Sequence, residues 1–229
     1  MMFSLSQMDW IAFGFFAFAW LFFEVVNDHS FLRNHSLSML MARRRREWML
    51  EMASRDLRMI DTQIMQSLQN GAAYFGSASI LAIGGCFALL GATDQVLQIY
   101  RDLPVGSEIS RQLFELKVFG LTVIFVYSFF KFGWAHRLFN YCSILIGSVP
   151  MVEHASLDVR KKAALEAAEM NIIASRHFTA GLRGIFFALA YLGWFINPWM
   201  LFGSTLFVIA VLTRRNYFSA ARRVLKDSE

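Results

Sequence analysis

Six ionisable side chains stand inside or at the ends of apolar stretches of this sequence: Glu24, Asp28, Lys131, His136, Arg137 and Arg183. Acids and bases held at one depth of an apolar medium can pair with each other, or they can line a polar path for an ion or a small solute. We expect Glu24 to pair with Lys131 first and with Arg183 second. The sequence leaves both uses, pairing and permeation, open.

Patterns for metal binding or catalysis are sparse. Asp28, His29, Glu153 and His154 supply ligand types, but the chain has no paired-ligand, metalloprotease or phosphate-loop motif. The two cysteines, at positions 86 and 142, fall in apolar stretches without CxxC spacing, so we expect buried thiols and neither a disulfide nor a zinc site. The sequence therefore predicts no enzyme activity, no cofactor and no resident metal.

The elements that must position these side chains are apolar helices. Hydrophobic residues make up 56% of the 229 residues and charged residues only 17%, far from the balance of a soluble domain. Windows of roughly 17 to 25 apolar residues can cross a bilayer as helices, and they occur at residues 9–26, 72–92 and 116–134. No base precedes the first window and no small-residue cleavage site follows it, so we expect a retained helix rather than a secretory signal.

A fourth apolar window, residues 181–212, is too long for one crossing and contains Asn197 and Pro198 near its centre. Asn-Pro is a turn signal, and proline suits the first position of a new helix. We therefore expect a helical hairpin with arms at 181–196 and 198–213. The predicted fold is one all-α domain, residues 1–229, with five membrane crossings.

The distribution of basic residues predicts the orientation, because Lys and Arg favour cytoplasmic connections. With five crossings, all three basic clusters fall on one side, which puts the N-terminus outside and the C-terminus in the cytoplasm of a multi-pass inner-membrane protein. The helical segments 36–70, 135–178 and 214–229 are then cytoplasmic. The clusters are Arg33, Arg43, Arg44, Arg45, Arg46, Arg55 and Arg58; Arg160, Lys161, Lys162 and Arg176; and Arg214, Arg215, Arg222, Arg223 and Lys226.

Four consecutive arginines, Arg43, Arg44, Arg45 and Arg46, lie in a segment whose apolar residues recur at helical spacing from Ser36 to Asn70. This segment is predicted to be a cytoplasmic helix that continues into the second crossing. Interleaved acids make it a poor nucleic-acid surface, and we expect no nucleic-acid partner. Binding of anionic lipid headgroups is the functional hypothesis for the four arginines, and a role in orientation alone is the alternative.

Small side chains repeat every four residues along the second crossing, at Ala72, Gly76, Gly84 and Ala88, with Ile80 interrupting the series. In lipid, helices associate through close backbone approach, which such a stripe permits. The stripe can serve packing inside the chain, self-association or the lining of a pore, and the sequence leaves these three open.

Three stretches, "RREWMLEMASRDLRMIDTQIMQSLQNGAAYFGSASILAIGG", "KVFGLTVIFVYSFFKFGWAHRLFNYCSILIG" and "FFALAYLGWFINPWMLFGSTLFVIAVLTRRNYF", resemble a membrane family of bacteria and plants known as the domain of unknown function number five-nine-nine. The likeness covers most of the chain from Arg43 onward. The resemblance implies an integral membrane protein with a shared core, and it supplies no activity and no catalytic residue.

Two classes of function fit these features. The first is a homo-oligomeric channel or transporter-like protein, in which the small-residue helix and the charged side chains build a path. The alternative is a scaffold or accessory subunit that binds another membrane complex and transports nothing. The two differ in whether Glu24, Lys131 and Arg183 face water or face one another.

The predicted orientation gives the first testable expectation. A reporter fused after Glu229 should report a cytoplasmic location and one fused before Met1 an external location, because all three basic clusters then share one side. Paired enzymatic reporters, active on opposite sides of the membrane, measure this directly. Both ends on the same side would mean that residues 181–213 form a single kinked crossing.

Overall fold

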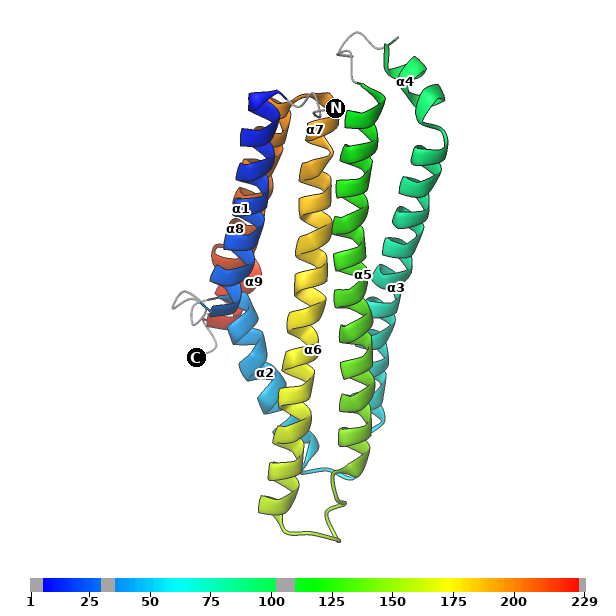
Figure 1. Ribbon diagram of the computed structural model, residues 1–229. Coiled ribbons are helices and arrows are strands. Elements are labelled where there is room, and N and C mark those ends of the chain that lie inside the picture. Colours follow the sequence, from blue (N-terminus) through cyan, green and yellow to red (C-terminus); the bar gives the residue numbers. More distant parts are fainter. Residues whose placement is uncertain (1–5, 30–35, 102–109, 227–229) are drawn as a thin grey trace. The chain divides into compact units, whose positions relative to one another are not determined.

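The computed structural model describes residues 6–29, 36–101 and 110–226, and throughout these residues the regular structure is helical. The prediction of an all-α fold is therefore confirmed. In chain order the helices are α1 (Gln7–His29), α2 (Leu37–Met52), α3 (Met59–Gly91), α4 (Thr93–Arg101), α5 (Arg111–Ser148), α6 (Leu157–Tyr191), α7 (Gly193–Ile196), α8 (Pro198–Tyr217) and α9 (Ala220–Lys226) (Figure 1).

Four helical segments of the described chain are long and apolar enough to cross a membrane: Gln7–Val25, Met59–Gly91, Arg111–Ser148 and Leu157–Ile196. They correspond to the first four predicted crossings. The predicted fifth crossing, 198–213, lies in α8, a helix of 20 residues that is not among these four. A fifth crossing and the orientation of the termini stay predictions.

Three of these helices are longer than a bilayer is thick. α3, α5 and α6 contain 33, 38 and 35 residues, which at 1.5 Å per residue gives lengths of about 50 to 57 Å. The hydrocarbon core of a bilayer is only about 30 Å thick. In a membrane these helices must therefore continue beyond the hydrocarbon, as the sequence predicted for the segment that follows the third crossing.

Contacts divide the chain into two compact units, each built from three separate segments. Unit 1 comprises Met1–Arg33, Ala78–Ser128 and Leu182–Arg215, and unit 2 comprises Asn34–Ser77, Phe129–Gly181 and Asn216–Glu229. α3, α5 and α6 contribute residues to both units. The description of residues 1–229 as a single domain stays a prediction.

Aromatic side chains fill the core of unit 1. Phe16 of α1, which is 2% exposed, meets the rings of Phe187 and Tyr191 of α6 edge-on at centroid distances of 5.9 and 5.3 Å. Val118 of α5 and Leu201 of α8 are fully buried in the same cluster. These apolar contacts join α1, α5, α6 and α8 into one packed unit.

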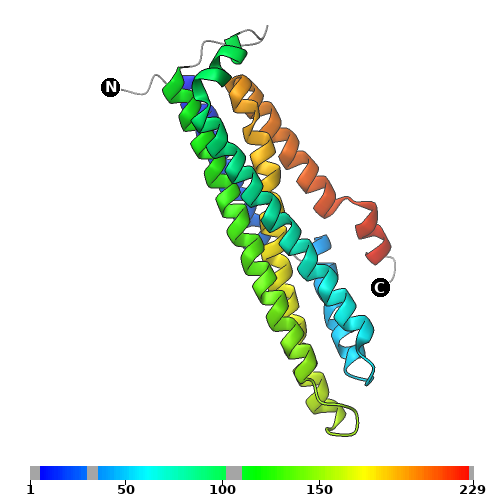
Figure 2. The same cartoon turned by 90° about the vertical axis from the view of Figure 1, so that its right-hand side faces the viewer.

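The hairpin predicted about Asn197 and Pro198 is present. Asn197 has φ −167° and ψ 166°, an extended conformation that ends α7, and Pro198 is the first residue of α8. The Asn197 Oδ1 caps the new helix by accepting a hydrogen bond from the Met200 N–H at 2.8 Å. Further along, the Ser204 hydroxyl donates to the Ala190 carbonyl at 2.6 Å, so α8 turns back beside α6 (Figure 2).

Unit 2 packs around small and sulfur-containing side chains. Ala164, Ala167 and Ala168 of α6 are fully buried, and side chains of this size let neighbouring helices approach closely. They share a core with Met49 of α2 and with Cys142 of α5, both also fully buried. The core of unit 2 thus combines closely packed helices with an aromatic group, Phe75, Phe132 and Phe178, whose ring centroids lie 5.5 to 5.8 Å apart.

The prediction of one continuous helix from Ser36 to Asn70 is wrong, because α2 ends at Met52 and α3 begins at Met59. The break frees Arg58 to donate to the carbonyls of Ile146, Val149 and Pro150 at 3.2, 2.5 and 2.9 Å. These carbonyls lie at the C-terminal end of α5, where a helix leaves acceptors unsatisfied. The carbonyls that Arg58 binds are distant from it in sequence, so helical periodicity alone could not reveal the break between α2 and α3.

The tight hairpin gives a second expectation. A Cβ on Gly193 would lie 2.6 Å from the Ser204 Oγ and 2.7 Å from the backbone oxygen of Met200, so Gly193→Ala should lower the free energy of unfolding by about 1 to 3 kcal/mol. A Cβ on Gly203 of α8 would meet nothing within 4 Å, so Gly203→Ala is the matched control. Thermal unfolding in detergent, followed by circular dichroism, measures both.

If Gly193→Ala unfolds at the same temperature as Gly203→Ala, α6, α7 and α8 do not pack as closely as described. The control should be neutral or slightly stabilising, because alanine favours a helix over glycine by about 1 kcal/mol.

Candidate functional site

A buried ion pair joins α1 to α6 within unit 1. The Arg183 Nη2 donates to the Glu24 Oε2, and the two side chains are only 10% and 16% exposed. The other carboxylate oxygen, Oε1, accepts a hydrogen bond from the Tyr127 hydroxyl of α5 at 3.2 Å. Three helices therefore meet at Glu24, and we name Glu24, Arg183 and Tyr127 the Glu24 cluster.

Local packing positions the Glu24 cluster. Gly184 follows Arg183 on α6, and a Cβ at this glycine would lie 3.2 Å from the Tyr127 ring, so α5 and α6 approach closely here. Trp20 of α1 meets the Tyr127 ring edge-on at 5.2 Å and stacks on Phe187 at 5.9 Å. The rings of Trp20 and Phe187 thus flank the cluster with apolar surface. In such surroundings the attraction between opposite charges is stronger than in water.

A second buried charged group in unit 1 was missed by the sequence interpretation. Asp9 of α1 and Lys117 of α5 are 7% and 3% exposed, and both contact Trp194 of α7. The Trp194 indole N–H donates to the Asp9 Oδ1 at 2.8 Å, and the Lys117 ammonium donates to the Trp194 carbonyl at 2.7 Å. The ammonium also lies 5.2 Å from the centroid of the indole ring, within the range of a cation–π interaction. We name these three residues the Asp9 cluster.

The two clusters lie near opposite ends of α1. Asp9 and Glu24 are fifteen positions apart in the sequence, which corresponds to about 22 Å along a helix. The buried aromatic core around Phe16, Phe187 and Tyr191 occupies the intervening turns. Each cluster contains one acid and one base. Unit 1 therefore brings an acidic and a basic side chain together near each end of α1.

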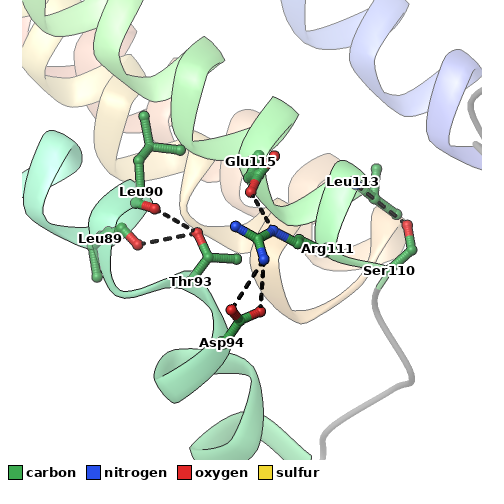
Figure 3. A network of polar contacts seen from close by, with 8 residues as sticks. All are labelled: Leu89, Leu90, Thr93, Asp94, Ser110, Arg111, Leu113 and Glu115. Atoms are coloured by element: carbon green, nitrogen blue, oxygen red, sulfur yellow. Dashed lines mark hydrogen bonds and ion pairs between the residues drawn. The ribbon is translucent and has the colours of Figure 1, made fainter.

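A further polar network of unit 1 lies where α4 and α5 begin (Figure 3). The Arg111 guanidinium of α5 donates to both carboxylate oxygens of Asp94 of α4 at 3.1 and 3.0 Å, and to Glu115 at 2.8 Å. The Arg111 and Asp94 side chains are 58% and 72% exposed. Exposed pairs of this kind contribute only about 0 to 1 kcal/mol. This exposed network joins the start of α5 to α4 and is separate from the two buried clusters.

Three residues of the predicted charged set, Lys131, His136 and Arg137, belong to unit 2. The His136 Nδ1 lies 3.3 Å from the Gln69 carbonyl, and the exposed Arg137 donates to the Tyr141 hydroxyl at 2.6 Å. The side chain of Asp28 lies outside the described residues. Glu24 has as its partner Arg183, which the sequence ranked second, and its pairing with Lys131 stays a prediction.

The predicted small-residue stripe divides into two parts. In unit 2, Ala72 is 1% exposed, and a Cβ on the buried Gly76 would lie 3.7 Å from the Phe132 Cβ. In unit 1, Gly84 and Ala88 are exposed, and a Cβ on Gly84 would meet nothing within 4 Å. The first part serves packing inside the chain, and the second is available to another helix.

The four consecutive arginines, residues 43–46, are named the arginine block, and they have different surroundings. Arg44 forms an exposed pair with Glu47 at 2.7 Å, whereas Arg45 donates to the buried Asn171 of α6. Arg46 pairs with Glu169 of α6 at 2.5 Å. Burial lowers the pKa of the Arg45 guanidinium below its ordinary value. Two of the four arginines therefore hold α2 against α6.

Metal ligands do not gather in the part of the chain that the structure describes: it contains no group of three or more His, Cys, Asp or Glu side chains placed to hold an ion. Cys86 and Cys142 are buried free thiols, as the sequence predicted. The Asn171 amide donates to the Met65 Sδ at 3.1 Å and lies 3.6 Å from the Cys142 Sγ. These contacts give the buried Asn171 amide sulfur acceptors inside unit 2.

A family model for a protein of unknown function matches residues 11–221 of the chain. The chain belongs to the DUF599 family. The resemblance noted in the sequence is thus confirmed, and the match includes Glu24, Lys117 and Arg183. No curated protein and no solved structure matches this DUF599 chain, so the roles of the two clusters must be argued from their geometry.

The Glu24 cluster gives a third expectation. Glu24→Gln or Arg183→Met alone should each lower the free energy of unfolding by about 3 kcal/mol, because either change leaves one charge buried without its partner. The double variant should recover at least half of the summed loss, since the two residues are in contact. Equilibrium unfolding in detergent measures all four proteins of the cycle.

The same cycle with Lys131→Met in place of Arg183→Met tests the partner that the sequence ranked first. The pairing observed in unit 1 would be contradicted by two results together. The double variant Glu24→Gln with Lys131→Met would recover the lost free energy of unfolding, and the losses for Glu24→Gln and Arg183→Met would simply add.

Proposed function

We propose that this DUF599 protein is an integral membrane protein that acts as a non-transporting scaffold or accessory subunit of a larger membrane assembly. The supporting observation is that Glu24 and Arg183 face each other with little exposure. A path that runs along these charged side chains would need them to face water, whereas Glu24 and Arg183 satisfy one another. The pairing favours the alternative that the sequence ranked second over the channel or transporter that it ranked first.

The proposed placement is a multi-pass chain in the inner membrane, with its N-terminus outside and its C-terminus in the cytoplasm. The four apolar helical segments support a membrane location, and the three basic clusters support the orientation. For the fifth crossing we propose α8, whose 20 residues span about 30 Å. Its last turn carries Arg214 and Arg215, which suit a cytoplasmic boundary.

A contact surface for assembly is available on the unit 1 part of α3. Gly84, Gly85 and Ala88 are exposed there, next to Leu81 and Phe87, which are 76% and 62% exposed. Small residues allow a second helix to approach, and the larger apolar side chains add packing area around it. We propose that this surface binds a helix of a second copy or of another membrane subunit.

The second candidate function is the homo-oligomeric channel, and one observation favours it. Because Gly84 and Ala88 face outward, they can lie at a junction between copies, where a path could form that a single chain does not contain. This candidate therefore predicts conductance that depends on assembly.

The proposed function gives the fourth expectation. Gly84→Leu should weaken assembly without destabilising the chain, because the added side chain enters open space in the single chain but separates two helices that meet there. Gly14→Leu is the matched control, since Gly14 of α1 is likewise open. Light scattering of the detergent complex gives the mass of each species, and reconstituted vesicles give its conductance.

A scaffold that self-associates through this surface predicts a smaller species for Gly84→Leu, and a scaffold of either kind predicts conductance at the lipid background for every variant. Conductance in the wild type that disappears in Gly84→Leu would overturn the scaffold in favour of the channel. A mass that is the same for the wild type and Gly84→Leu would exclude self-association through this surface.

A further inference from the structure

The four side chains of the arginine block cannot all lie on the same side of α2. Consecutive residues of an α-helix are separated by about 100° around the axis, so four arginines in sequence point to different sides of α2. Arg45 and Arg46 reach Asn171 and Glu169 of α6. Arg43 is exposed, and the Arg44 side chain is 40% exposed beside Glu47. The structure therefore separates two arginines that bind α6 from two that are presented outward.

α9 adds a second source of positive charge to the same unit. α9 packs against α2, and its sequence AARRVLK carries Arg222 and Arg223. Arg223 is exposed and Arg222 is half-buried. The contact between α2 and α9 thus brings two arginine-bearing helices together, and an excess of positive charge in one region favours a bound anion.

Apolar side chains accompany these bases. Phe218, just before α9, and Val224 within it are 73% and 71% exposed, and Met41 of α2 is 40% exposed. Interfacial helices combine a basic polar face with large apolar side chains that enter the headgroup region. A purely acidic surface would complement the arginines but not the apolar groups, whereas an anionic bilayer surface complements both.

We propose that Arg43, Arg44 and Arg223, together with Phe218 and Val224, form a docking surface for anionic phospholipid headgroups. We name this set the α2–α9 surface. The proposal rests on the membrane placement proposed above and is independent of the scaffold role. It narrows the lipid hypothesis from the whole arginine block to its outward half, and it adds α9, which the sequence interpretation had assigned only to orientation.

The test uses the full chain, purified in detergent and incubated with equal amounts of phosphatidylglycerol and phosphatidylcholine. Native mass spectrometry then counts the lipids of each kind that remain bound. The wild type should retain phosphatidylglycerol in preference, and Arg43→Gln with Arg223→Gln should reduce that preference at least about fivefold, since each base near a lipid surface contributes measurably to anionic binding.

The matched control is Lys161→Gln with Lys162→Gln, which removes two exposed bases of α6 from the same unit. Its preference should change less than about twofold, because these residues lie outside the proposed set. An equal loss in both variants would show that only net charge matters and would overturn the proposal, as would a wild type without preference for phosphatidylglycerol. Release of the wild-type chain from membranes by alkaline carbonate would instead refute the membrane placement itself.

Discussion

An ionised side chain inside an apolar helical bundle needs an opposite charge or several hydrogen bonds nearby, because burial removes it from water. The Glu24 cluster satisfies this requirement with an ion pair and a tyrosine hydroxyl. The Asp9 cluster satisfies it through Trp194, which donates to the acid and accepts from the base. These contacts hold α1, α5, α6 and α7 together, and the aromatic core of unit 1 packs between them.

Unit 2 meets the same requirement with arginines and backbone carbonyls. Arg58 binds three carbonyls at the end of α5, and Arg160 of α6 donates to the Ala53 carbonyl at 2.5 Å. Arg45 reaches the buried Asn171. The arginines that the sequence analysis used to predict orientation therefore have a second role. They bind carbonyls at the C-terminal ends of helices and hold α2 against α6. This dual use explains why only part of the arginine block is presented outward.

Most of the helices could be predicted from sequence, because apolar windows and the Asn197–Pro198 turn are local signals. The break between α2 and α3 could not, since it depends on Arg58 meeting carbonyls about 90 positions away. Glu24 was predicted to pair with a base, but its observed partner Arg183 ranked second because chain order does not define which helices are neighbours. Asp9 and Lys117 were overlooked because they stand at the ends of predicted crossings, where a charge ordinarily faces water.

The central claim, which belongs to the proposed function, is that the buried charged groups of the Glu24 cluster and the Asp9 cluster are satisfied by protein partners and line no aqueous path. Ser128 of α5 tests it directly, because this residue follows Tyr127 and is fully buried. With Cys86 and Cys142 replaced by serine, Ser128→Cys in reconstituted vesicles should resist a water-soluble thiol reagent added to either side. Rapid labelling of this cysteine from one side, with the fold intact, would contradict the account, because it would place water beside the Glu24 cluster.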